Sequence, residues 1–280
     1  MKNIAKLLSI LLLVSSVVCG VFIACSKDSV KKEVFSGYAQ KGPFVIGSSV
    51  TISELKANLD QTGKTYSTII SDNLGRFEEK NIELVSSYVE LKVDGYYFHE
   101  VAGWVEGTLT LYALVDIKDV NSANVNVLTH LEKPRVEYLV KQGMSFSAAK
   151  QQAQREVLAI FGFSPPQTSS EGLDVINDAM LLAISCILQG NIAISGHLSE
   201  LMANISADIK TDGKLDNIAL GKQLMDNAIV LTTFNTNYNS TWLPKIRENL
   251  ETKFNVTAPD FESYIQAFVN SDLYPRIDVY

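Results

Sequence analysis

The fold is decided at residues 89–101, which read VELKVDGYYFHEV. Apolar and charged side chains alternate from Val89 to Val93, and a period of two is typical of a strand that buries one face. Asp94-Gly95 then precedes a second run of strand-forming residues, and this dipeptide supplies the positive φ angles that a tight hairpin turn needs. The stretch therefore predicts two antiparallel strands joined at Asp94-Gly95.

The same period continues on both sides of this stretch. Residues 108–112 alternate again, residues 50–52 and 66–70 supply earlier strands, and glycines recur between the runs. Short strands separated by frequent turns are typical of an antiparallel sandwich. We therefore predict an all-β sandwich, prealbumin-like or immunoglobulin-like, over residues 36–120.

Two segments of this half resemble carboxypeptidase regulatory-like domains. Residues 68–77, TIISDNLGRF, are similar to the hairpin of that family in which threonine, aspartate, glycine and phenylalanine recur. Residues 42–52, GPFVIGSSVTI, are similar to its opening pair of strands. The resemblance covers most of residues 36–120 and implies a prealbumin-like sandwich.

The hydrophobic period changes to 3.6 in the second half of the chain, which is the spacing of amphipathic helices. The first such segment, residues 126–142, contains Pro134, which predicts either a helix start or a kink there. Residues 174–189 are apolar almost all round, as in a helix buried at the centre of a domain. We predict an all-α helical domain over residues 121–280, so that the chain has two domains, an all-β sandwich followed by an all-α domain.

The amino terminus has the features of a secretory signal, with two lysines, an apolar run over residues 7–24 and then Cys25. The sequence around Cys25, FIACS, resembles the bacterial lipobox. The resemblance implies that residues 1–24 are a signal peptide, that Cys25 receives the acyl chains, and that Ser26 directs the protein to the outer membrane. An uncleaved anchor over residues 7–24 is the alternative, and both place the remaining chain outside the cytoplasm. Residues 25–35 predict a flexible tether.

Composition limits the partners and cofactors. The formal net charge of −7 argues against a nucleic-acid partner. Three cysteines exclude a disulfide scaffold and every four-cysteine metal site, and three scattered histidines exclude the usual zinc-hydrolase clusters. We therefore expect neither a metal nor a cofactor. Cys186 lies in an apolar run and is expected to be a buried, unreactive thiol.

Aromatic side chains that follow Gly95 supply the candidate ligand-binding residues Tyr97, His99 and Trp104. Strand alternation places Tyr97 and His99 on one face. An exposed row of this kind can stack on a sugar ring. The alternative is that this face belongs to the core.

Two other groups of residues could carry chemistry. Lys41, Asn121 and Glu100 could form an intramolecular isopeptide bond of the kind found in adhesins, which needs a buried lysine and a buried acid. His130 or His197 could act in a cryptic enzyme together with an acid from another helix. The alternative for the first group is a chance occurrence, since any domain has such residues. The alternative for the two histidines is a capping or core role.

Residues 37–44 and 124–131 together resemble surface proteins of Bacteroidetes and Fibrobacter type, which pair a regulatory-like sandwich with a helical domain. This resemblance implies no particular reaction. We therefore predict a lipid-anchored, non-catalytic binding, adhesion or structural module that meets a glycan or protein partner. A glycan-binding surface protein of a polysaccharide-uptake system is the alternative, and an enzyme is the third hypothesis.

Overall fold

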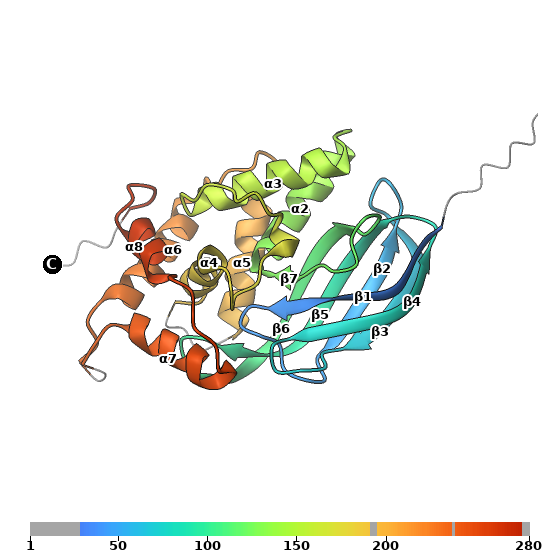
Figure 1. Cartoon of the computed structure of the whole chain (residues 1–280). Coiled ribbons are helices and arrows are strands. Elements are labelled where there is room, and N and C mark those ends of the chain that lie inside the picture. Colours follow the sequence, from blue (N-terminus) through green and yellow to red (C-terminus); the bar gives the residue numbers. More distant parts are fainter. Residues whose placement is uncertain (1–28, 191–194, 237–238, 276–280) are drawn as a thin grey trace, which may run out of the picture.

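The computed structural model describes residues 29–190, 195–236 and 239–275 (Figure 1). Its strands are β1 (Val30–Gln40), β2 (Ser49–Leu55), β3 (Gln61–Ile69), β4 (Arg76–Leu84), β5 (Tyr88–His99), β6 (Trp104–Asp116) and β7 (Val125–Asn126). They form one sheet in the order β3-β2-β5-β6 and another in the order β4-β1-β7. Neighbouring strands are antiparallel except β1 and β7, which are parallel.

The predicted hairpin turn at Asp94-Gly95 is wrong. β5 continues through this dipeptide to His99 and pairs with β6 throughout. Gly95 serves close packing instead, because a Cβ at this position would lie 2.2 Å from Oγ of Ser48. The turn comes after His99, where Gly103 has a φ of +86° and donates its backbone N–H to the His99 carbonyl.

The helices follow the strands along the chain. They are α2 (Val127–Lys141), α3 (Phe146–Ile160), the short 3-10 helix η1 (Ser170–Gly172), α4 (Ala179–Gln189), α5 (Ser195–Ile209), α6 (Ile218–Thr232), α7 (Trp242–Phe254) and α8 (Glu262–Val269). Pro134 lies inside α2, so the helix does not start there. Residues 180–189 of α4 are all buried, which confirms the central helix predicted from its apolar composition.

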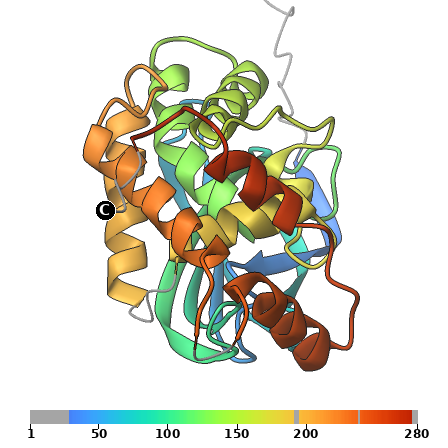
Figure 2. The same ribbon diagram turned by 90° about the vertical axis from the view of Figure 1, so that its left-hand side faces the viewer.

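Strands and helices share a hydrophobic core, and the predicted division into an all-β and an all-α domain is therefore wrong. A continuous cluster of buried side chains runs from Val93 and Leu111 in the sheet, through Leu131 in α2, to Ile184 in α4. The helices gather on one side of the strands, as Figures 1 and 2 show, and α2 and α5 contact β6 there. A helix as apolar as α4 must be covered on every side; α2, α5, α6 and α8 pack against it, and Tyr97 of β5 reaches Gln189 at its end. The chain thus has a mixed fold with its strands mostly in the first half.

The two segments that resemble surface proteins, residues 37–44 and 124–131, meet at the junction between strands and helices. The Tyr38 N–H donates to Oδ1 of Asn124 at 2.9 Å, and β7 pairs with the end of β1. Asn126 then caps α2, since its side chain accepts from the Thr129 N–H and the Thr129 hydroxyl accepts from the Asn126 N–H. This reciprocal cap starts α2 directly at the sheet.

The beginning of the chain also differs from the prediction. Residues 30–35, assigned above to a flexible tether, form the first part of β1 and pair with β4. Val30 lies opposite Leu84 in that pairing. Residues 1–24, Cys25 and the rest of the tether up to residue 28 lie outside the described residues. The predicted domain boundary between residues 120 and 121 falls in the connection from β6 to β7.

Candidate binding pocket

A cavity of about 280 Å³ opens between the β6–β7 connection, α2, the first turns of α3, and η1. We call it the η1 pocket. Its lining residues are mostly polar and come from segments that are far apart in sequence: Asp116, Lys118, Asp119, Glu132, Phe146, Ser147, Lys150, Gln151, Gln154, Ser169, Ser170 and Glu171. This set contains four carboxylates and two ammonium groups, so the lining of the pocket carries a net negative formal charge.

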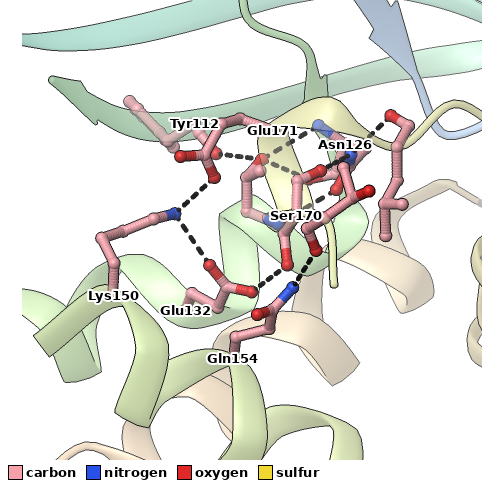
Figure 3. A network of polar contacts seen from close by, with 10 residues as sticks. Tyr112, Asn126, Glu132, Lys150, Gln154, Ser170 and Glu171 are labelled. Carbon is pink, nitrogen blue, oxygen red and sulfur yellow. Dashed lines mark hydrogen bonds and ion pairs between the residues drawn. The ribbon is translucent and has the colours of Figure 1, made fainter. Parts of the chain in front are cut away.

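A network of ion pairs and hydrogen bonds forms the base of the pocket (Figure 3). Nζ of Lys150 lies 2.9 Å from Oε2 of Glu132 and 3.0 Å from Oε2 of Glu171. The Ser170 hydroxyl donates to Oε1 of Glu132. The Gln154 amide donates to the carbonyl of Thr168 at 2.9 Å. One ammonium group thus joins a carboxylate of α2 to a carboxylate of η1.

Burial sets the proton affinities in this network. Glu132 is fully buried, and burial together with the nearby Glu171 carboxylate raises the pKa of Glu132, although Lys150 and the Ser170 hydroxyl oppose this shift. Burial would by itself lower the pKa of Lys150, but attraction by Glu132 and Glu171 outweighs it and raises that pKa. Lys150 therefore remains a permanent positive charge between two acids.

The helix cap described above also positions the base of the pocket. The Asn126 side-chain amide donates to the Ser170 carbonyl at 2.8 Å and to the Leu173 carbonyl at 3.2 Å. The Asn124 N–H donates to the Glu171 carbonyl at 2.7 Å. Because Asn126 is completely buried, its cap and its two amide hydrogen bonds hold η1 at the start of α2.

The rim of the pocket is more open than its base. Ser147 and Gln151 are exposed on α3, and Lys118 and Asp119 are exposed on the β6–β7 connection. Phe146 packs its ring against Tyr88 with centroids 4.8 Å apart, so an aromatic side chain borders the polar rim. This arrangement offers fixed charges at the base, and hydroxyl and amide groups at the entrance, to a small polar ligand.

A second buried charge cluster joins the sheet to α4. Nζ of Lys41 lies 2.5 Å from Oε2 of Glu100, and both side chains are wholly inaccessible to solvent. The Ser185 hydroxyl lies 2.7 Å from Oε1 of Glu100 and 2.6 Å from the Lys41 carbonyl. Two members of the predicted isopeptide group therefore meet. Asn121 is exposed and takes part in β1 pairing through its carbonyl, which accepts the Ser36 N–H.

The predicted ligand-binding row is divided by the fold. Tyr97 and His99 are buried, whereas Trp104 is 56% exposed. The Tyr97 hydroxyl donates to Oε1 of Gln189 in α4 at 3.3 Å, and Nδ1 of His99 accepts the Ala102 N–H. Both residues continue the alternation that buries Val89, Leu91 and Val93 on the core face of β5, and the extra residue at the register shift between β5 and β6, Gly107, lies in β6. A sugar ring arriving from solvent can therefore reach Trp104 but not its two predicted neighbours.

The two histidines proposed for catalysis lie in different surroundings. His130 stacks on Tyr112 with ring centroids 5.8 Å apart, and burial, aided by the charge of Lys133, lowers its pKa to about 4. His197 is exposed on α5. Within residues 29–275, leaving aside the short undescribed segments, no three histidine, cysteine, aspartate or glutamate side chains gather to hold a metal ion.

Cys186 is buried, as predicted. Burial raises the pKa of its thiol well above the ordinary value, which disfavours the reactive thiolate. Among the residues that the structure describes, no helix combines the length and the apolar character needed to cross a membrane.

Comparisons with known proteins give no relative. No family model, no curated protein and no solved structure matches this chain.

Sequence reasoning missed the η1 pocket. None of Glu132, Lys150, Ser170 and Glu171 belongs to a recognised motif, and they come from three separate elements. One local signal was available: Glu132 and Lys150 occupy buried positions on helices whose other inward residues are mainly apolar. Charged residues in such positions need partners, and each partner here lies on another element.

Proposed function

We propose that the protein is a lipid-anchored binding protein outside the cytoplasm, attached through Cys25, which holds a small polar ligand in the η1 pocket. The observation that carries the ligand-binding part is the pocket itself, with its charged, hydrogen-bonded base. Its volume of about 280 Å³ is close to the lower end of the ~300–1,000 Å³ that is usual for small-molecule sites. The anchor rests on the resemblance of residues 22–26 to a lipobox.

The base of the pocket suits binding better than turnover. The Lys150 ammonium is paired with two carboxylates, and the Ser170 hydroxyl is bonded to one of them. A nucleophile or general base needs a group that can accept or release a proton during the reaction, and these groups are committed to one another. We therefore propose recognition by a rigid polar surface, without a chemical step.

Glycan binding is the second candidate, and the lining of the rim favours it. Ser147, Gln151 and Asp119 supply hydroxyl, amide and carboxylate groups, which match the mixed donors and acceptors of a sugar. Phe146 supplies a neighbouring aromatic ring. A pocket of this size has room for about one sugar ring, so the ligand would be a monosaccharide or the end of a longer chain.

Titration of soluble protein from Ser26 onward with a panel of small polar ligands that includes monosaccharides and short oligosaccharides tests both versions. Ser147→Trp places a large ring at the rim and should abolish binding of any sugar that the wild type holds. Ala148→Trp is the matched control, because Ala148 is also exposed on α3 but does not line the pocket. A sugar that binds both variants equally well would rule out this pocket, and a panel without any binder would rule out the glycan candidate.

The anchor has a separate test. Mass spectrometry of the amino-terminal peptide should find acyl chains on Cys25, and Cys25→Ala should move the protein from the membrane fraction into the soluble fraction. Recovery of the unmodified wild-type chain from the cytosol would overturn this part of the proposal.

A further inference from the structure

We infer that one end of the strands, the end at which β1 begins, faces the lipid bilayer. The helices α6, α7 and α8 are then directed away from the lipid. This inference rests on the proposed lipid at Cys25. Val30, Leu84 and the β4–β5 turn at residues 85–87 form this end, which we call the anchor end. Its partner is the lipid surface.

The first argument is the length of chain between the lipid and the body. Four residues, 26–29, separate Cys25 from Val30, where β1 begins. At about 3.3 Å per residue, five steps span no more than roughly 17 Å. The predicted tether of residues 25–35 would have allowed about twice that reach. The short connection therefore keeps Val30 near the bilayer in every orientation of the body.

The second argument is that the anchor end is rigid from its first residue. Val30 pairs with Leu84 of β4, and the pairing continues along β1 to Tyr38. The β4–β5 turn that follows Leu84 is held by Glu54 of β2, because Oε1 of Glu54 accepts hydrogen bonds from the N–H groups of Val85 and Ser86. Burial by itself would raise the pKa of the Glu54 carboxyl, but the hydrogen bonds from the Ser86 N–H, the Thr62 hydroxyl and the Val85 N–H together hold it below its ordinary value. Movement of Val30 relative to the turn is thereby restricted.

The third argument is the chemistry of the turn. Val85 is 55% exposed and stands beside two serines, at residues 86 and 87, which carry no charge. An exposed valine in an uncharged turn, next to the point where the tether leaves, fits the interfacial region of a bilayer, where apolar side chains are favoured. The turn adds a weak contact to an attachment that the acyl chains already provide.

The helices lie at the other end of the molecule. β1 begins at the right-hand end in Figure 1, whereas α6, α7 and α8 lie at the left. A body held by its right-hand end therefore presents these helices to the surroundings. The η1 pocket is nearer to the lipid, since Nζ of Lys32 donates to the carbonyl of Lys118 at its rim, and Lys32 is only seven residues from Cys25.

Fluorescence quenching in membranes tests this orientation. Val85→Cys and Ile218→Cys each add one reactive thiol to the full chain, and Cys186 stays unlabelled because it is buried. Ile218 is the matched control, since it is an exposed aliphatic residue (69%) at the start of α6. The lipidated variants are labelled with an environment-sensitive dye and placed in vesicles of phosphatidylethanolamine and phosphatidylglycerol that carry a headgroup quencher.

We expect strong quenching at position 85 and at least a several-fold weaker effect at position 218. A ten-residue glycine-serine insertion after Ser26 should reduce the quenching at position 85 while the protein stays in the membrane. Equal quenching at both positions in vesicle-bound protein would overturn the orientation and leave the anchor intact. Failure of the wild type to carry a lipid would overturn the proposed anchor itself, and the orientation with it.

Discussion

His130 should make the stability of the protein depend on pH in the weakly acidic range. Its ring stacks on Tyr112, and Nδ1 is a buried atom without a hydrogen-bond partner among the described residues. Protonation would place a positive charge in this buried position beside Lys133. Burial is the larger cause and Lys133 the smaller cause of the lowered pKa, which falls from 6.5 to about 4.

The direction and size of the effect follow from this difference in pKa. The unfolded chain binds a proton at His130 as the pH falls through 6.5, whereas the folded protein does so only near 4. The stabilisation is therefore fully present above pH 6.5 and is lost as the pH falls between these values. A shift of this size corresponds to about 3 kcal/mol at the acidic limit, and about 2 kcal/mol should already be lost at pH 5.

Urea unfolding of the soluble chain from Ser26, measured between pH 7.5 and pH 4.5, tests this reasoning. His130→Phe keeps an aromatic ring on Tyr112 but cannot be protonated, so the difference in unfolding free energy between wild type and variant should change by about 2 kcal/mol towards pH 5. His197→Phe introduces the same ring at an exposed position and serves as the control. A difference for His130→Phe that stays constant over the whole pH range would refute the argument.

Three other predictions follow from buried groups. Lys150→Met leaves two carboxylates at the pocket base without their cation and should lower the free energy of unfolding, measured in urea, by about 3–5 kcal/mol. Lys222→Met removes the cation of a partly exposed ion pair and should lower it by less than about 1 kcal/mol in the same assay. Gly37→Ala should lower it by about 1–3 kcal/mol in the same assay, because its Cβ would lie 1.9 Å from the Ala123 carbonyl oxygen; a neutral result would show that β1 can move away from this loop. Cys186 should react with a thiol reagent only as fast as the protein unfolds, and rapid labelling of native protein would contradict its burial.

Prediction from sequence succeeded where a local pattern has one structural outcome. The period of two identified strands before residue 120, and the period of 3.6 identified the helices after it. The uniformly apolar composition of α4 predicted its central position, because such a helix can be stable in water only when it is covered on all sides. The apolar run also predicted that Cys186 is buried, and this is confirmed.

Local patterns failed where a residue can serve two purposes. Asp94-Gly95 is a strong turn signal, yet Gly95 lies inside β5, since the small residue is needed beside Ser48. Tyr97 and His99 look like a binding row in sequence, but they lie on the same face of β5 as Val89, Leu91 and Val93, which packs into the core, and Tyr97 contacts Gln189 of α4 there. Nothing within the segment reveals the packing role of Gly95, whereas the alternation of Val89, Leu91 and Val93, continued to residues 97 and 99, already favoured the core alternative for the aromatic row.

The type and order of most secondary-structure elements follow from the amino-acid sequence alone, because the spacing of apolar residues is a property of each segment. That strands and helices share a core, and that Glu132, Lys150 and Glu171 meet at one pocket, becomes visible once the chain is folded. The same holds for the start of β1, which lies only five residues after Cys25. These facts depend on which surfaces pack together and on which buried charges find partners across the fold, and both are set by contacts between residues that are distant in the chain.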